Sequence, residues 1–226
     1  MASNRPRPPK GSKSRQAAPE PPKKPFPIVP VLFVAIGAIL VGAIVFTGGE
    51  SDTGPQFGDV ELNGAALARY PASGFATIAE DPALGETIPT VTGTDLDGNE
   101  MTIAADGTPK AIAFLAHWCN HCQAEVPRVT EWVQETGGVD GVELVAVTTS
   151  IDSVRGNYPP DKWLRDENWP APTMRDDQGN SAHLSYGGGG FPYWVFVNGD
   201  GQVVARTAGQ TDIGTLQALM GLARDG

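Results

Sequence analysis

Two cysteines that lie three positions apart are the residues of this sequence best suited to chemistry. Cys119 and Cys122 occur in the stretch HWCNHCQAEVP, and the 226 residues contain no other cysteine. A chain of this length can bury a core without disulfide cross-links. A four-ligand zinc site would need two further ligands from three histidines and the carboxylates. Thiol–disulfide chemistry is therefore the leading interpretation, with a metal site and a structural disulfide as alternatives.

The residues that follow the first cysteine have helical spacing, which assigns a role to each thiol. Apolar side chains recur with a helical period from Cys122 to Val133, and Gly137 stops the pattern. A cysteine at the start of a helix lies beside unpaired backbone N–H groups and the positive end of the helix dipole, which favour thiolate over thiol. We therefore expect Cys119 to be the nucleophile. Cys122 lies on the same helix face, is expected to be more buried, and can attack a mixed disulfide formed on Cys119.

The elements around this helix indicate a mixed α/β domain. Two apolar runs, residues 111–116 and 142–149, are suited to strands that are buried on both faces. The turn at residues 97–98 and the NGDG turn between residues 193–197 and 202–207 indicate two antiparallel hairpins. The sheet therefore contains both buried central strands and hairpin strands.

The remaining segments complete this domain. Residues 150–190 form a central insertion, with a short helix expected around residues 161–167 and a strand and turn after it. A final helix with one apolar face follows, and Thr211 or Asp212 can cap it.

The N-terminal part of the chain has the composition of a membrane anchor. Residues 1–27 hold seven Lys or Arg, eight prolines and one acid, which predicts a disordered cytoplasmic tail. Residues 28–46 carry no charge and are long enough to cross a hydrocarbon core of about 30 Å, so we expect a transmembrane helix. A cleaved signal peptide is the alternative, but the apolar run is long and no A-x-A pattern follows it. The positive-inside rule places the cysteines outside the cytoplasm, where disulfides persist.

A linker is expected between the anchor and the domain. Residues 47–84 are rich in Gly, Ala, Pro and acids and have weak periodicity, although the stretch ALARYPASGF could add a short ordered piece. The α/β domain is expected over residues 85–226.

The element order, with WCNHC where the first buried strand meets the helix, resembles the thioredoxin superfamily. Several separated features carry the resemblance: Trp118 before the first cysteine, Pro127 five residues after the second, Phe191-Pro192 before the late hairpin, and the NGDG turn. The first hairpin, the insertion and the single anchor are more similar to the TlpA and ResA branch of membrane-tethered thiol–disulfide oxidoreductases than to thioredoxin itself. The expected fold is an α/β thioredoxin fold with an N-terminal β-hairpin and a central insertion, preceded by one transmembrane helix.

The resemblance implies roles for residues around the cysteines. Trp118 would form a wall of the active-site surface. In the family, the proline that matches Pro192 is cis and faces the cysteines, so the backbone of Phe191 can pair with an extended substrate peptide. An ordinary strand-entry proline is the alternative for Pro192. Pro127 should kink the helix that contains it.

His121, between the two cysteines, bears on the direction of electron flow. A partly protonated imidazole would further stabilise the Cys119 thiolate, and C-x-H-C is similar to the pattern in DsbA, a strong oxidant. The reduction potentials of thioredoxin and DsbA, about −270 mV and about −120 mV, correspond to a difference of roughly 7 kcal/mol in the free energy of reduction. Lowering the pKa of the nucleophilic thiol from about 7 to about 3.5 supplies nearly 5 kcal/mol of that difference. An exposed histidine with little influence is the alternative, and resemblance to TlpA and ResA favours reduction instead. The direction therefore stays open.

One position departs from the family pattern. Six residues before Cys119, where thioredoxin and DsbA have a buried acid, this chain has Ala113, so a proton relay through that acid cannot operate. Glu125 or an acid of the insertion could substitute through water, but we expect Glu125 to be an ordinary surface residue of its helix. His117 and His183 are expected to be non-catalytic.

These features predict a membrane-anchored, extracytoplasmic thiol–disulfide oxidoreductase that exchanges disulfides with protein partners. The expected catalytic residues are Cys119, Cys122 and His121, and the expected substrate-binding residues are Trp118, Phe191 and Pro192. No cofactor or metal is expected because the electrons stay in the sulfur pair. A membrane redox partner is compatible with the anchor. The chain after Phe46 has 25 acidic and nine basic residues, which excludes nucleic acid as a partner. Alternatives from other classes are a copper-delivery module that uses Cys119, Cys122 and His121, and a redox-inactive binding domain on the same scaffold.

Overall fold

The computed structural model describes residues 57–226 of the chain. The strands are β1 (Glu61–Asn63), β2 (Thr90–Asp95), β3 (Glu100–Ile103), β4 (Lys110–Leu115), β5 (Glu143–Thr148), β6 (Thr173–Arg175), β7 (Tyr193–Val197) and β8 (Val203–Ala208). The helices are the 3-10 helix η1 (Ile78–Glu80) and the α-helices α2 (Asn120–Thr136), α3 (Pro160–Asp166), α4 (Ser181–Ser185) and α5 (Ile213–Asp225).

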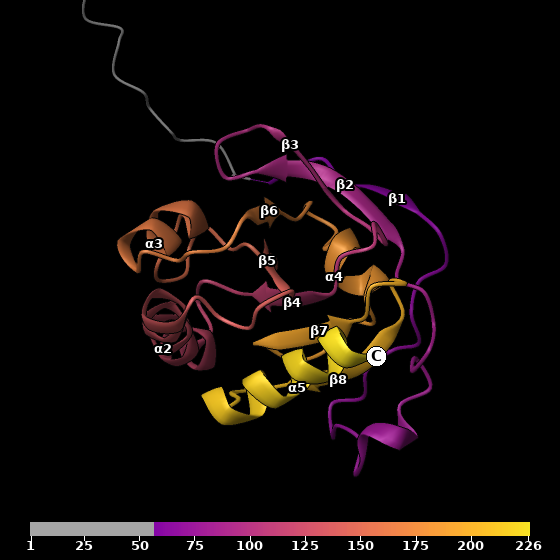
Figure 1. Cartoon of the computed structure of the whole chain (residues 1–226). Coiled ribbons are helices and arrows are strands. Elements are labelled where there is room, and N and C mark those ends of the chain that lie inside the picture. Colours follow the sequence, from indigo (N-terminus) through magenta and orange to yellow (C-terminus); the bar gives the residue numbers. More distant parts are fainter. Residues whose placement is uncertain (1–56) are drawn as a thin grey trace, which may run out of the picture. The chain divides into compact units, whose positions relative to one another are not determined.

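The eight strands form one mixed sheet. Its order is β1-β2-β6-β5-β4-β7-β8, and β3 pairs with β2 outside this path (Figure 1). Strands β4, β5 and β6 are parallel, whereas β7 runs antiparallel to β4 and β8 runs antiparallel to β7. All six residues of β4 are buried, as a strand covered on both faces requires. The prediction of a mixed α/β sheet with buried central strands is confirmed.

Alternating side chains of the central strands supply two cores, one on each face of the sheet. On β4, Ala113 and Leu115 belong to the core that α2, α3 and α5 cover, whereas Ile112 and Phe114 belong to the other core. That second core also contains residues of α4 and of the segment before β2. The cysteines belong to the first core, so α2 is fixed to the sheet on the side where the chemistry is expected.

Both predicted hairpins are present. β2 pairs with β3 across the turn at residues 97–98, where the Asp95 carboxylate accepts hydrogen bonds from the backbone N–H groups of Asp97 and Asn99 at 2.8 Å. β7 pairs with β8 across the NGDG turn. The side chain of Asp212 caps α5 by accepting a hydrogen bond from Thr215 N at 3.0 Å. The sequence left Thr211 and Asp212 open as caps, and the structure selects Asp212.

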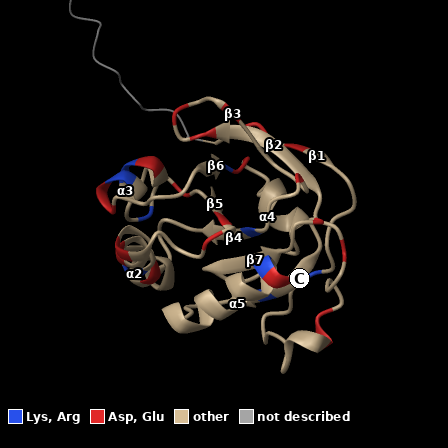
Figure 2. Cartoon of the chain, in the orientation of Figure 1, with Lys and Arg blue, Asp and Glu red and all other residues tan. Residues whose placement is uncertain are grey.

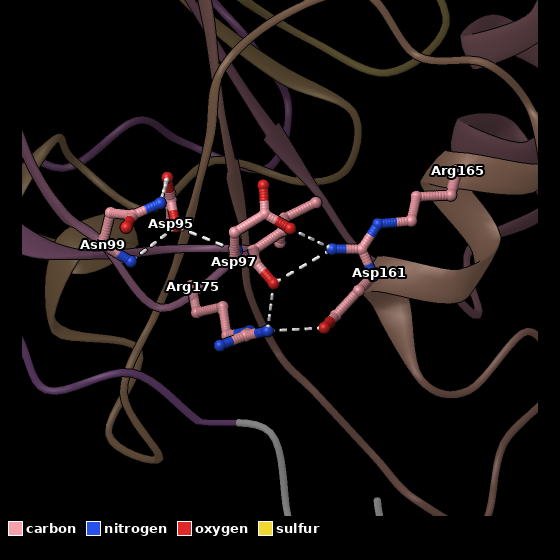
Figure 3. Close-up of polar contacts among 7 residues, drawn as sticks. Asp95, Asp97, Asn99, Asp161, Arg165 and Arg175 are labelled. Atoms are coloured by element: carbon pink, nitrogen blue, oxygen red, sulfur yellow. Dashed lines mark hydrogen bonds and ion pairs between the residues drawn. The ribbon is translucent and has the colours of Figure 1, made fainter. Parts of the chain in front are cut away.

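The insertion is joined to the rest of the domain by a polar network between α3, β6 and the β2–β3 turn (Figure 3). Arg165 donates to the Asp97 carboxylate at 2.6 Å, and Arg175 donates to the Asp161 carboxylate at 2.6 Å. Both guanidinium groups also donate to the carbonyl of Leu96. Since β6 is itself a strand of the sheet, these contacts fix the insertion to the sheet.

The segment before β2 differs from the expectation of a linker over residues 47–84, of which residues 47–56 lie outside the described residues. The ordered piece that the sequence left open at ALARYPASGF is present. From residue 57 onward it packs on the domain, with β1 paired to β2 and Leu67, Tyr70 and Ala83 buried. Asp81 forms a fully buried ion pair with Arg206 of β8. Arg206 compensates the buried charge of Asp81, so this acidic, weakly periodic segment packs on the domain without leaving either charge unpaired in the interior.

The expected tail, residues 1–27, and the expected transmembrane helix, residues 28–46, lie outside the described residues. Between residues 57 and 226, none of the helices combines the length and the apolar character needed to cross a membrane.

Candidate active site

Cys119 sits at the N-cap of α2, directly after the end of β4. Its extended backbone lets its carbonyl accept the first helical hydrogen bond, from Gln123 N at 3.0 Å. The sulfur is partly exposed, and the thiol donates to the carbonyl of Phe191 at 3.6 Å. The N-cap position places this sulfur beside the unpaired N–H groups of the first helical turn. Cys119 is therefore the accessible thiol of the pair.

Cys122 lies one turn further along α2 and has no solvent exposure. Burial raises the pKa of its thiol far above the ordinary range, against a smaller lowering by the backbone of Ala116. The charges of Cys119 and Glu125 raise it further. Both cysteines are free thiols in this structure. A partly exposed first cysteine and a buried, protonated second thiol suit an attacking and a resolving thiol respectively.

Glu125 is buried behind the cysteines, so the expectation of a surface glutamate is wrong. Its side chain is 1% exposed, and its two oxygens accept hydrogen bonds from Trp194 Nε1 at 2.7 Å and Thr211 N at 2.5 Å. Burial raises the pKa of its carboxyl, which these two hydrogen bonds and the Arg128 charge partly oppose. A buried carboxyl that holds its proton more tightly than usual is suited to exchange a proton with the neighbouring Cys122.

The small residue Ala113 lies directly opposite Trp194 in the β4–β7 ladder. The strand position that holds the acid in the related pattern is thus occupied by a methyl group, and an acid from α2 binds the indole of Trp194. In this chain the buried carboxyl near the cysteines therefore comes from α2 and not from β4.

Trp118 is held between the insertion and the loop before β7. Its indole Nε1 donates to the carbonyl of Ser150 at 2.7 Å, and the Arg155 guanidinium stacks 4.2 Å from the ring centroid. Its ring also contacts Phe191 edge-on, with centroids 6.1 Å apart. Trp118 and Phe191 therefore lie together beside Cys119, and their role in substrate binding stays a prediction.

The Phe191–Pro192 peptide bond is cis, as expected from the resemblance. It precedes β7 and brings the Phe191 carbonyl to the Cys119 sulfur. The Phe191 ring packs on His183, with centroids 4.8 Å apart. The loop before β7 and the start of α2 therefore meet at the reactive sulfur.

The three histidines differ in burial. His121 is exposed on the first turn of α2, and its effect on the Cys119 thiolate stays a prediction. His117 is fully buried, and its ring nitrogens pair with the Gly156 carbonyl at 2.7 Å and with Asp152 N at 3.2 Å. His183 is also buried, and its Nε2 pairs with the Gly189 carbonyl at 2.9 Å. Burial lowers the pKa of both buried histidines, that of His183 to about 4. These two neutral rings hold the loops on either side of Trp118 and Phe191.

Comparison with protein families agrees with this geometry. A family model described as Redoxin matches residues 83–219. The chain belongs to the Redoxin family.

Individual relatives of this Redoxin domain carry related descriptions. The thiol:disulfide interchange protein HelX of Rhodobacter capsulatus is 30% identical over 106 residues, which cover 46% of this chain and 54% of that protein. The chain thus spans about half the length of the curated relative it matches. A thiol:disulfide interchange protein of the thioredoxin family from Chlorobium tepidum superposes with a TM-score of 0.50 at 20% identity, over 61% of this chain and 94% of that one. A thioredoxin-like protein of Neisseria meningitidis gives a TM-score of 0.51 at 21% identity, over 60% and 88% of the chains. These structures show that the fold is thioredoxin-like.

The site offers little to a metal ion. Within residues 57–226, no group of three or more His, Cys, Asp or Glu side chains is arranged to hold one. Cys122 is buried in the helix-covered core whereas His121 is exposed, so the geometry does not favour the copper-delivery alternative.

Glu125 is the functional candidate that sequence reasoning misjudged. The signal was its position three residues after Cys122, which places both side chains on one face of α2. The sequence does not show that Trp194 Nε1 and Thr211 N donate hydrogen bonds to Glu125, because both residues are distant from it in the chain.

Proposed function

We propose that this protein is an extracytoplasmic, membrane-anchored thiol–disulfide oxidoreductase that exchanges disulfides with protein substrates through Cys119 and Cys122. The general class is supported by membership of the Redoxin family and by relatives named as thiol:disulfide interchange proteins. The single observation that carries the mechanism is the asymmetry of the pair. One sulfur is partly exposed at the N-cap of α2, and the other is buried beside a buried carboxyl.

In the reducing direction, the Cys119 thiolate attacks one sulfur of a substrate disulfide. The substrate S–S bond breaks, a mixed disulfide forms on Cys119, and the second substrate sulfur leaves as a thiolate that takes a proton. Cys122 then loses its proton to the Glu125 carboxylate and attacks the Cys119 sulfur. This step breaks the mixed disulfide, releases the first substrate sulfur as a thiolate that takes a proton, and leaves Cys119 and Cys122 joined by a disulfide. The substrate thus gains two electrons and two protons, which balance the proton that Cys119 lost in forming its thiolate and the proton that Cys122 gave to Glu125. The oxidising direction is the reverse of these steps.

The test of this mechanism compares two single variants. Cys119→Ser should abolish disulfide exchange with a reporter such as insulin, because no accessible thiol remains. Cys122→Ser should still attack but should accumulate a mixed disulfide on Cys119, which mass spectrometry detects. Full exchange activity in Cys119→Ser would rule out the mechanism.

Direction and location have tests of their own. Equilibration with glutathione or dithiothreitol buffers gives the reduction potential, where a value near that of thioredoxin, about −270 mV, supports reduction and one near that of DsbA, about −120 mV, supports oxidation. Replacing His121 with Pro should make the couple more reducing, since it removes the imidazole beside the thiolate. Protease added to intact spheroplasts should digest the domain only if it lies outside the cytoplasm.

A further inference from the structure

The basic side chains of the described domain are almost all neutralised within the domain. Residues 57–226 contain nine Lys or Arg and 23 Asp or Glu, and Figure 2 shows acids on α2, α3 and the β2–β3 hairpin. Eight of the nine have a carboxylate within 4.0 Å: Lys110, Arg128, Arg155, Lys162, Arg165, Arg175, Arg206 and Arg224. Arg69 is the exception among these residues, because none of the described carboxylates forms an ion pair with it. Its exposed guanidinium is available to a carboxylate from another molecule.

Arg69 lines a groove that begins at the candidate active site. The groove has a volume of about 430 Å³, in the range of known ligand sites. Its lining residues are Arg69, Tyr70, Ala72, Gly188, Gly189, Gly190, Phe191, Ala208 and Gly209. Phe191 is the residue whose carbonyl lies 3.6 Å from the Cys119 sulfur. A chain seated in the groove can therefore reach the reactive thiol.

One side of the groove is glycine backbone. A β-carbon on Gly189 would overlap the ring of Tyr193, so this position must lack a side chain. A β-carbon on Gly190 would meet no atom within 4 Å and would therefore point into open space. Gly188 N and the Gly189 carbonyl already pair with His183, so the exposed Gly190 is the position of this run where an extended peptide can approach the backbone.

The opposite side of the groove is held in place by backbone hydrogen bonds. Leu67 N donates to the Ser185 carbonyl at 2.9 Å, and Tyr70 N donates to the Gly187 carbonyl at 2.8 Å. These two bonds bracket Arg69 and fix its backbone next to the glycine run. Arg69 is therefore a positioned group, with a free side chain on a fixed backbone.

We propose that this groove binds the substrate segment next to the reacting cysteine and that Arg69 pairs with an Asp or Glu side chain of that segment. This inference rests on the proposed function, because it concerns the substrate of Cys119. Charge complementarity selects the occupant, since Arg69 is the only charged residue that lines the groove. The large excess of acidic residues repels acidic peptides from the rest of the domain surface. Arg69 therefore makes this groove the place where an acidic side chain is attracted.

The test uses the full-length reduced chain and short synthetic peptides with one cysteine, blocked as a mixed disulfide with 5-thio-2-nitrobenzoate. Attack of Cys119 on the peptide sulfur releases the coloured thiolate, which gives kcat/KM. Asp, Asn or Lys is placed in turn at each position along either side of the cysteine. At one or more positions, we expect the Asp peptide to react about three- to tenfold faster than the Asn peptide, and the Lys peptide to react slowest.

Two variants separate Arg69 from general charge. Arg69→Gln should lower the rate of the Asp peptide to that of the Asn peptide. Arg224→Gln, a matched loss of one charge at the exposed end of α5, should keep the wild-type preference. High salt should also remove the preference, since an exposed ion pair is screened.

The outcomes distinguish this inference from the proposed function. Equal rates for Asp and Asn peptides at every position would overturn the role of Arg69 while the Cys119 chemistry stands. Absence of colour release from every peptide would overturn the proposed function and this inference with it. If Arg69→Gln accelerated all peptides equally, the groove would already hold an acid of this chain or of a second copy, which also overturns the inference.

Discussion

Replacing Glu125 with Gln should slow the second half of the exchange reaction far more than the first. Gln has nearly the same shape, but it cannot take the proton of Cys122. Its amide has one oxygen, so either Trp194 Nε1 or Thr211 N loses its acceptor. A buried donor without a partner costs about 1–3 kcal/mol of unfolding free energy, which the fold should tolerate.

The size of the effect follows from the burial of Cys122. Each unit by which burial raises the pKa of this thiol lowers its thiolate fraction at neutral pH about tenfold. A positioned proton acceptor contributes about 10²- to 10⁴-fold to a proton transfer. We therefore expect Glu125→Gln to slow resolution by at least about 10²-fold at pH 7. The remaining rate should rise about tenfold per pH unit, because hydroxide must then deprotonate Cys122.

Stopped-flow tryptophan fluorescence with a small disulfide isolates this step, since Trp118 adjoins the pair. At high disulfide concentration the attack on Cys119 outruns resolution, and the observed rate reaches a plateau equal to the resolution rate. The initial slope with concentration reports the attack and should change little. Glu125→Asp, which keeps a carboxylate, should retain more of the plateau rate than Gln. A plateau in Glu125→Gln within threefold of the wild type, with the same pH profile, would refute the role of Glu125.

Two further predictions concern stability. Asp81→Ala leaves the buried Arg206 charge without a partner, so it should lower the unfolding free energy by about 3–5 kcal/mol and Tm by roughly 6–20 °C in urea and thermal denaturation. Asp200→Ala, at an exposed carboxylate, should change stability little, and a loss below about 1 kcal/mol in Asp81→Ala would contradict the buried pair. His183 has a pKa of about 4 in the folded chain against about 6.5 unfolded, so its neutral form contributes stability above pH 6.5 that is lost as the pH falls toward 4, by up to about 3 kcal/mol. The wild type should therefore lose more stability than His183→Gln over this pH range, and parallel pH curves would count against this assignment.

The parts of the fold that the sequence predicted are those with local signals. The apolar run at residues 111–116 identified β4, the period after Cys122 identified α2, and the NGDG turn identified the β7–β8 hairpin. Each signal lies within a few residues, so composition and spacing were sufficient. The roles of Cys119 and Cys122 follow from their places at the start of α2, which was equally local.

The parts that the sequence did not predict depend on partners distant in the chain. The segment before β2 is packed through the pair of Asp81 with Arg206, which are 125 residues apart. It is also held by backbone hydrogen bonds, such as that from Tyr70 N to the Gly187 carbonyl, which the pattern of side chains in the sequence does not predict. Glu125 was assigned to the surface because a glutamate is rarely buried without a partner, and its two donors come from the C-terminal third of the chain.

The buried Asp81–Arg206 pair also bears on where this domain begins as a modular unit. The Redoxin match starts at residue 83, whereas Asp81 lies just upstream of it. A shortened protein that starts at the family boundary would retain the guanidinium in the interior and lose its counter-charge. We therefore expect the autonomous folding unit to begin before the residues that match the family. A truncation series across residues 57–85 should show solubility falling abruptly when Asp81 is removed.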